Sequence, residues 1–570
     1  MPEERTRIDE ARERAAGSGP KSEGGDGAPG RPDPLAPFRW HPEPELLAVH
    51  ADTARDALTA AGRAAWDSAV AYVLDEGLRR GMGEPAGYEE LRTLYFGPGG
   101  GPRPAPDGPT PFRELLDEFR TRLAPHMLNA WHPATLSYFT PPPLVASVAG
   151  ELLAQVTQQG VDIWHAGPVA AFVEEEVVRW LCDLVGYGAG SFGLLASGGT
   201  MANFIGLALA RESRLPRLRS DGRPPRGAAL EGVRVYASDQ THFSVRRALD
   251  ELGFPPGTLR VVAADDRFRL RGAPVAQAIA EDRSQGLLPL AISAVAGSTN
   301  TGSVDAIDEL ADVAEREGLW LHVDAAYGAA ARLSRGAASR VPALERADSV
   351  TVDPHKWFFQ AYDIGGIVVR DGDELRTVFG SSRPEYYRGG GLERITASAA
   401  AGGLEHEADA DREADAHGLD FYKLGFEGSR RWRALKLWMS WRHLGTSGLG
   451  RLVDMNLAVA AHLASSIAAS DDFEALPAAP ELSVVCFRHL PGGRARAAGL
   501  DPRELDAHQD RLQAALEASG DGWLSTTRLR GATYLRAGVL NYLTTEADID
   551  ALLDRLRALA GELEGVTARA

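Results

Sequence analysis

The 570-residue sequence is poor in cysteine, in long apolar runs and in positive charge. Its two cysteines, Cys182 and Cys486, are too few for a disulfide framework or a metal cluster, and such scarcity suits a reducing compartment. No segment reads as an apolar run long enough to span a bilayer, and the first residues lack the apolar core of a signal peptide. The formal net charge of −18 disfavours nucleic acid and anionic membranes as partners. We therefore expect a soluble, cytoplasmic protein without a metal site.

The length exceeds what one hydrophobic core supports, so two or three domains are expected. Residues 1–37 are rich in glycine, proline and charge, a composition typical of disorder. Helical spacing of apolar residues follows, and it returns after a Gly/Pro-rich linker. We divide the chain into a disordered extension (1–37), a helical N-terminal arm (38–130), a large α/β domain (131–447) and a small α+β domain (448–570).

Short apolar segments alternate with helical segments through the large domain. The predicted strands cover residues 233–237, 259–263, 288–295, 319–324 and 350–353. Such alternation predicts a mostly parallel central sheet flanked by helices, in which ligands bind beyond the carboxyl ends of the strands. Asp305, with Asp308 three residues later, resembles a capping box that opens one of the helices.

A glycine-rich turn, Ser197-Gly-Gly-Thr200, lies between a short apolar strand and a helix that begins near Met201. Glycines let backbone amides approach a ligand, and a helix N-terminus favours an anion. The turn is therefore a candidate phosphate cradle. A plain strand–turn–helix junction is the alternative, and the turn matches neither a Walker loop nor a dinucleotide fingerprint.

A lysine, Lys356, follows the strand that ends at Asp353 and precedes a second apolar run, 366–369. Charged groups avoid apolar surroundings because desolvation costs several kcal/mol. A desolvated lysine has a lowered pKa, and its neutral amine attacks a carbonyl to form a Schiff base. The alternative is an exposed lysine at a strand end.

Several ligand-like groups fall at predicted strand ends. Besides the glycine-rich turn, they are His242, Thr299, Asp324, His355 and Lys356. Each alone could be a satisfied loop residue, but their shared topological position indicates one site. Pyridoxal phosphate needs such a set: amides and hydroxyls for its phosphate, a carboxylate for its pyridine nitrogen and a lysine for its aldehyde.

The sequence resembles the group II pyridoxal-phosphate-dependent decarboxylases, which include aromatic-L-amino-acid, glutamate, histidine and diaminobutyrate decarboxylases. The resemblance runs from about Trp131 to the C-terminus, and its motifs occur in the family's order. They are Ser197-Gly-Gly-Thr-Met-Ala-Asn203, His242, Ala296-Gly-Ser-Thr-Asn-Thr-Gly302, His322-Val-Asp-Ala-Ala-Tyr327, Asp353-Pro-His-Lys-Trp357 and Ser429-Arg-Arg-Trp-Arg-Ala-Leu-Lys-Leu-Trp438. It implies a fold-type I enzyme that acts as a homodimer with active sites at the subunit interface.

The resemblance also implies residue roles. Lys356 would bind the aldehyde of pyridoxal phosphate covalently, and Asp324 would pair with the pyridine nitrogen. His242 would stack on one face of the ring and Ala326 would lie against the other. The remaining cofactor residues, near or at the phosphate, would be Gly199, Thr200, Thr299 and His355.

A mobile catalytic loop, which we place at 383–418, carries in the family a tyrosine that protonates Cα. Tyr386 stands two residues after a proline and fits this position; Tyr387 would replace it if the alignment shifts by one, and Tyr422 is a weaker candidate. Exposed loop tyrosines without a role are the alternative. The glycine- and acid-rich segment 389–418 reads as solvated and mobile rather than as a binding tail.

Two further features have no role in this scheme. Asp363 stands near the start of a strand where many relatives carry a cysteine. Residues 429–441 are predicted as a helix with a basic face, which we interpret as solvated or salt-bridged, with an arginine at a dimer interface as the alternative.

Substrate choice depends on the pocket. Four aromatic residues lie near prolines or loops and form a candidate aromatic approach to the site: Trp131, Tyr138, Phe139 and Trp164. We therefore expect decarboxylation of an aromatic L-amino acid to its amine. Glutamate- or diaminobutyrate-type decarboxylation, an aldehyde synthase, another pyridoxal-phosphate aminotransferase or lyase, and a catalytically silent homologue remain alternatives.

Overall fold

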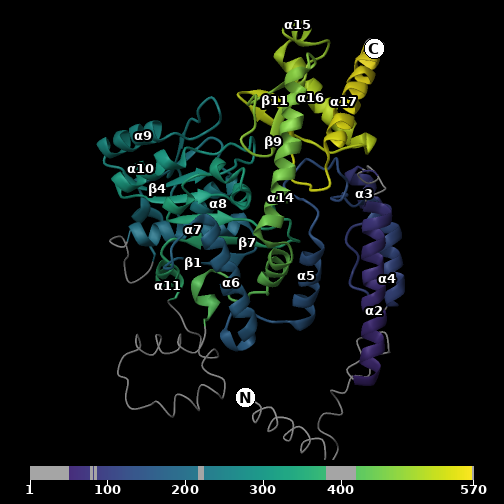
Figure 1. The fold of residues 1–570 in the computed structure, drawn as a ribbon, viewed down its shortest axis with the longest axis horizontal. Helices are drawn as coiled ribbons and strands as arrows, with labels where there is room; N and C mark the ends of the chain where they lie inside the picture. The colour runs from purple at the N-terminus through teal and green to yellow at the C-terminus, as the bar shows by residue number, and fades with distance from the viewer. Residues whose placement is uncertain are drawn as a thin grey trace, which may run out of the picture. The chain divides into compact units, whose positions relative to one another are not determined.

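The computed structural model describes residues 51–77, 81, 87–108, 110–215, 224–380 and 419–567 (Figure 1). The chain divides into two compact units, one of 1–68 with 106–117 and one of 69–105 with 118–570. The predicted disordered extension, the acidic segment 389–418 and the candidate proton donors Tyr386 and Tyr387 lie outside the described residues.

The N-terminal part of the described chain is helical, as its apolar spacing predicts. Its helices are α2 (Ala51–Ala71), η2 (Tyr72–Gly77), α3 (Tyr88–Phe96), α4 (Phe112–Glu118), η3 (Phe119–Leu123) and η4 (Ala124–His126). The predicted linker between α3 and α4 is free of helix and strand where it is described.

A seven-stranded sheet forms the centre of the second unit (Figure 1). Its order is β1 (Phe192–Ala196), β7 (Gly365–Val369), β6 (Ser349–Val352), β5 (Trp320–Asp324), β4 (Leu288–Val295), β2 (Val233–Ser238) and β3 (Leu259–Val262). The five strands from β6 to β3 run parallel, whereas β7 is antiparallel to both of its neighbours. The predicted mostly parallel sheet is confirmed.

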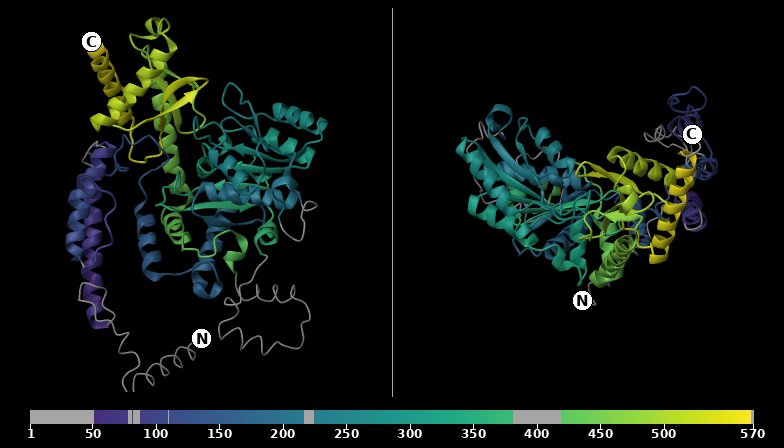
Figure 2. Two further views of the ribbon diagram at one scale, coloured as in Figure 1. Left: turned by 180° about the vertical axis from the view of Figure 1, so that it is seen from behind. Right: turned by 90° about the horizontal axis from the view of Figure 1, so that it is seen from above.

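Helices cover both faces of this sheet (Figure 2). One face packs against α6 (Pro168–Val185), α9 (Gly272–Ser284) and α10 (Ile307–Glu317), and the other against α7 (Gly199–Arg214) and α8 (Phe243–Glu251). Along β7, Val368 joins the first core and its neighbours Ile367 and Val369 join the second. Because both faces are covered, the strands are almost continuously apolar.

The smaller sheet is antiparallel, with the order β10 (Ser525–Leu529), β11 (Ala532–Gly538), β9 (Val484–His489) and β8 (Phe473–Ala475). It packs with α16 (Pro502–Ser519) and α17 (Glu546–Thr567). The predicted start of α17 is confirmed by hydrogen bonds between Thr545 and Asp548, and its predicted apolar face is buried.

The long helix α14 (Ala434–Ala469) connects the two sheets and packs along α5 (Val145–Thr157). It has a kink at Gly445, close to the predicted domain boundary at 448. By length and composition α14 is apolar enough to cross a membrane, so the expectation that the chain has no such run was wrong; 44% of its apolar window is buried inside the protein. Both cysteines are free and buried: Cys182 lies in α6 and Cys486 in β9.

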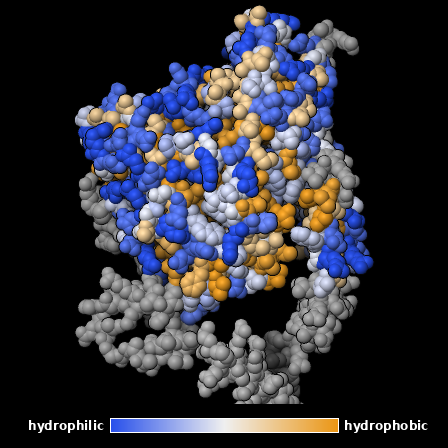
Figure 3. All heavy atoms as spheres, in the orientation of Figure 1, coloured by the Kyte–Doolittle hydropathy of each residue, from blue (hydrophilic) through white to orange (hydrophobic). Residues whose placement is uncertain are grey.

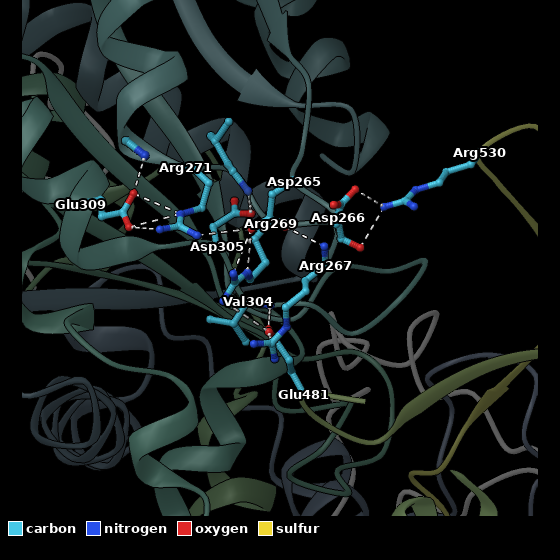
Figure 4. Close-up of polar contacts among 12 residues, drawn as sticks. Asp265, Asp266, Arg267, Arg269, Arg271, Val304, Asp305, Glu309, Glu481 and Arg530 are labelled. Atoms are coloured by element: carbon cyan, nitrogen blue, oxygen red, sulfur yellow. Dashed lines mark hydrogen bonds and ion pairs between the residues drawn. The ribbon is translucent and has the colours of Figure 1, made fainter. Parts of the chain in front are cut away.

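The predicted capping box at Asp305 was wrong (Figure 4). Helix α10 begins after Ala306 without a side-chain cap. The Asp305 carboxylate instead accepts hydrogen bonds from the backbone N–H groups of Leu270 and Val295, each at 2.7 Å, and its burial raises its pKa to about 7. These bonds fix the carboxyl end of β4, which lies at the site described below.

The close approach of α5 and α14 requires a glycine. A Cβ added at Gly150 would lie 2.6 Å from Lys436 Cα, which is too close for any backbone to tolerate unmoved. We predict that Gly150→Ala separates the two helices and lowers the free energy of unfolding by about 1–3 kcal/mol. Thermal unfolding of the purified protein measures the loss as a reduced midpoint.

The control is Gly561→Ala in α17, where an added Cβ meets no atom within 4 Å. Alanine in an unobstructed helix is stabilising by up to about 1 kcal/mol. Equal unfolding midpoints for the two variants would contradict the packing argument.

Candidate active site

A cavity of about 370 Å³ lies at the carboxyl ends of β4, β5 and β6, next to the first turn of α7. All predicted cofactor residues line it: Gly199, Thr200, His242, Thr299, Asp324, Ala326, His355 and Lys356. These residues are up to 157 positions apart in the chain. The sequence predicted that they lie together because ligands in such sheets bind beyond the carboxyl ends of the strands.

Lys356 lies in the turn that follows β6, with 23% of its side chain exposed. Its Nζ is 3.6 Å from Oδ2 of Asp353, a carboxylate that is 1% exposed. The same Oδ2 accepts a hydrogen bond from the Gly199 N–H at 3.0 Å, and His355 Nδ1 lies 2.9 Å from Oδ1. Asp353 therefore connects the lysine to the start of α7. The sequence places Asp353 at a strand end and within a motif, but neither observation predicts this connecting role.

The turn at the start of α7 brings backbone close to the cavity. A Cβ at Gly199 would lie 3.2 Å from both Ala326 Cβ and Asp353 Oδ2, and a Cβ at Gly365 would lie 2.4 Å from Gly198 Cα. The first N–H groups of a helix have no partner within that helix, and its dipole favours an anion there. A turn of this kind at a helix start would suit the phosphate of pyridoxal phosphate, so the phosphate cradle stays a prediction.

Asp324 ends β5 and is 7% exposed. Its Oδ1 accepts from the Ala326 N–H at 3.1 Å and its Oδ2 accepts from Asn203 Nδ2 at 2.7 Å. These two bonds fix the carboxylate at the cavity wall, where it fits a protonated ring nitrogen. Asn203 is a residue that we did not single out; its place one helical turn after the glycine-rich turn was the available signal.

His242 is the N-cap residue of α8 and lines the same cavity. Its Nδ1 lies 2.7 Å from Ser244 Oγ. Burial lowers the pKa of His242, and of the nearby charges Asp324 opposes this effect while Lys356 adds to it. The imidazole is therefore uncharged at neutral pH, which suits a ring that stacks against a cofactor.

Phe139 lines the cavity together with a second aromatic residue, Tyr327. Its ring stacks on Tyr327 at 4.4 Å, and the Arg536 guanidinium lies 4.7 Å from its centroid. Arg536 is 5% exposed and donates to the carbonyls of Thr299 at 2.7 Å and Ser137 at 2.5 Å, and its burial lowers its pKa. No carboxylate among the described residues forms an ion pair with it.

The other three predicted substrate residues are not among the described residues that line this cavity. Tyr138 is 58% exposed and packs edge-on against Trp523. Trp164 packs edge-on against Phe172, and Trp131 is half-buried. Side-chain direction in a loop depends on distant contacts, so the four aromatics do not form one wall in this chain. Tyr422, in η12 (Phe421–Leu424), also lies outside this lining.

Asp363 gains a structural explanation. Its carboxylate pairs with Arg431 at 2.8 Å and with Arg433 at 3.2 Å. The helix predicted from 429 begins only at Ala434, because the arginines before it are held by ion pairs to separate segments, as in the pair of Arg430 with Glu174. The salt-bridged interpretation of this basic cluster is confirmed.

The approach of β7 to the glycine-rich turn gives a test of the phosphate cradle. We predict that Gly365→Ala displaces Gly198 and weakens pyridoxal phosphate binding by at least about tenfold, because the new Cβ collides with backbone. The dissociation constant is measured by titrating apoprotein with pyridoxal phosphate.

The neighbouring Gly366→Ala is the matched control. Its Cβ would approach the Leu195 side chain at 3.3 Å, which can shift, and its contacts with Leu194 O at 3.6 Å and Leu181 Cδ1 at 3.7 Å are ordinary van der Waals distances. We expect near-normal affinity for this variant. A Gly365→Ala protein that binds the cofactor as tightly as its control would disprove the cradle.

The chain is similar to known proteins over most of its length. The model of the pyridoxal-dependent decarboxylase conserved domain matches residues 99–389 and 410–490. The chain is 32% identical to an aromatic-L-amino-acid decarboxylase of Bacillus atrophaeus, over 79% of this chain and 86% of the relative. It is 30% identical to an L-2,4-diaminobutyrate decarboxylase of Rhizobium meliloti, over 82% and 86%. A solved structure of Oryza sativa TDC with PLP and tryptamine matches with a TM-score of 0.76 and 26% identity, covering 90% of this chain and 99% of that one.

Proposed function

The chain belongs to the pyridoxal-dependent decarboxylases, and from that premise we propose that it converts an aromatic L-amino acid into its amine and carbon dioxide. It is a fold-type I enzyme of the carboxy-lyase class and uses pyridoxal phosphate. The observation that carries the proposal is the convergence of Lys356, Asp324 and His242 on one cavity that Phe139 also lines.

The cofactor, when bound, accepts the electron pair released as the bond from Cα to the carboxylate breaks. The residues of this chain prepare that step. The Lys356 amine would hold the aldehyde, the first turn of α7 would bind the phosphate, and Asp324 would keep a proton on the ring nitrogen. The uncharged His242 would cover one ring face and exclude water from it.

The aromatic preference rests on Phe139 and on the similarity to an aromatic-L-amino-acid decarboxylase. Phe139 presents an apolar ring that a substrate ring could pack against. A diamino acid is the second candidate, because the chain is also 30% identical to an L-2,4-diaminobutyrate decarboxylase. Tyr386, or Tyr387 in its place, stays the predicted donor of the proton to Cα.

The direct test incubates holoenzyme with the common L-amino acids, L-DOPA, 5-hydroxytryptophan and diaminobutyrate, and reads products by mass spectrometry. We expect amines from aromatic substrates alone. Amine from an acidic or diamino substrate would replace the proposed specificity. An aldehyde with hydrogen peroxide and ammonia would reveal an aldehyde synthase, and no product from any substrate would overturn the proposal.

We predict that Asp324→Asn reduces kcat by at least about 100-fold, because the amide cannot keep the ring nitrogen protonated as charge develops. Initial rates of amine formation measure the loss. Asp308→Asn, which changes an exposed carboxylate on α10, is the control and should retain normal turnover. Normal turnover of the Asp324 variant would contradict the role of Asp324 in keeping the ring nitrogen protonated.

We also propose that the chain acts as a cytoplasmic homodimer. Apolar side chains are exposed together on α5 and on the start of α6: Val145, Leu152, Leu153, Val156, Val169 and Phe172. Hydrophobic surface gathers over these helices in Figure 3. Contiguous exposed apolar surface supports a subunit interface. The cytoplasmic proposal is supported by the two unpaired cysteines.

We predict that Val156→Glu converts the dimer into a monomer, because it places a charge in the apolar contact. Val156 is 63% exposed, so the fold of one subunit should be unaffected. Light scattering after size exclusion gives the mass. The control is Val261→Glu on the edge strand β3, where the valine is 50% exposed and outside the apolar group on α5 and α6. Identical masses for both variants would reject α5 as the interface.

A further inference from the structure

The buried side-chain amide of Asn203 connects two residues of the site. One is Asp324, assigned to the ring nitrogen of the cofactor, and the other is His242, assigned to a ring face and reached through Ser244. Asn203, on α7, is 1% exposed. Its Nδ2 donates to Asp324 Oδ2 at 2.7 Å and to Ser244 Oγ at 2.9 Å. Its Oδ1 accepts from Thr351 Oγ1 at 2.7 Å and is 3.0 Å from His322 Nε2. These four contacts use both donors and both acceptor sites of the amide.

Only one orientation of this amide is chemically consistent. A carboxylate accepts and cannot donate, so the nitrogen of Asn203 must face Asp324. The oxygen then faces His322, whose Nε2 must carry a proton. On the other side of that ring, Ser349 Oγ accepts from Trp320 Nε1 at 2.9 Å, which leaves the Ser349 proton for His322 Nδ1 at 2.8 Å.

The same amide determines the protonation pattern at His242. Ser244 Oγ accepts from Asn203, so its hydroxyl proton is available to His242 Nδ1 at 2.7 Å. The Ser244 backbone N–H also approaches this nitrogen, at 3.4 Å. Nδ1 of His242 is therefore an acceptor, and the proton of the uncharged ring is on Nε2.

We propose that Asn203 is a positioning residue that sets the Asp324 carboxylate and the His242 tautomer together, so that both meet the pyridine ring of pyridoxal phosphate in the correct state. The inference rests on the proposed roles of Asp324 and His242. Its consequence is that Asn203, which also belongs to the cavity lining, acts on the ring nitrogen through its hydrogen bond to Asp324.

The test compares two cofactors, pyridoxal phosphate and 1-deazapyridoxal phosphate, in which a C–H replaces the ring nitrogen. Their dissociation constants are measured by titrating apoprotein. In the wild type, the bond to Asp324 should favour pyridoxal phosphate roughly 10- to 100-fold. With Asn203→Leu, which removes the donor to Asp324 at similar size without adding a charge, the preference should fall to within about threefold of unity.

The matched control is Thr351→Val. It removes a buried hydrogen bond to the same amide but leaves the bonds of Asn203 to Asp324 and Ser244 intact. The preference for pyridoxal phosphate should remain at the wild-type value, even where both affinities fall. If Asn203→Leu fails to fold, Asn203→Ala removes the same donor with a smaller side chain, and its preference should fall in the same way.

The outcomes separate the two hypotheses. A large preference in the wild type that survives in a folded Asn203 variant overturns this inference and leaves the role of Asp324 intact. Equal affinity of the wild type for both cofactors overturns the role of Asp324, and with it the proposed function of the site. A preference that also collapses in Thr351→Val shows that Asn203 acts only through general packing, which contradicts the positioning role.

Discussion

The geometry of the site depends on the buried carboxylate of Asp353. Burying a charge costs several kcal/mol unless partners compensate it. Asp353 Oδ2 accepts from the Gly199 N–H, Lys356 Nζ lies 3.6 Å from the same oxygen, and His355 Nδ1 lies 2.9 Å from Oδ1. The first partner belongs to α7 and the others to the turn after β6. One anion thus fixes the distance between the amine that would hold the cofactor's aldehyde and the turn that would bind its phosphate.

The sequence predicted this part of the site well because its signals are local. Strand β4 was predicted with its observed ends, and Lys356 and Asp324 each follow an apolar run closely. The residues that position these groups were missed. Asn203 lies 121 positions from its partner Asp324 and 148 positions from its partner Thr351, so no local pattern indicates the contacts. At Asp305 a local signal was misleading. Its spacing matched a helix cap, but its carboxylate accepts hydrogen bonds from the backbone N–H groups of Leu270 and Val295 instead.

A buried ion pair also determines the backbone just before α14. Arg430 pairs with Glu174 of α6 and donates to the carbonyls of Val161 and Leu195, while Glu174 accepts from the Leu195 N–H. This arrangement clamps the end of β1 just before the glycine-rich turn. The segment before Ala434 is therefore not helical as predicted, because one helix face could not bring these arginines to partners on different elements.

The burial of both cysteines has a consequence for oxidative chemistry. The thiolate is the form that reacts with peroxides and disulfides, and burial raises the pKa of Cys486 to about 12 and also raises that of Cys182. Cys486 contacts the carbonyl of Asn300, next to the cavity residue Thr299. Any oxidant produced or admitted at the cavity would thus meet a protonated, inaccessible sulfur, so this chemistry leaves the protein's own thiols intact.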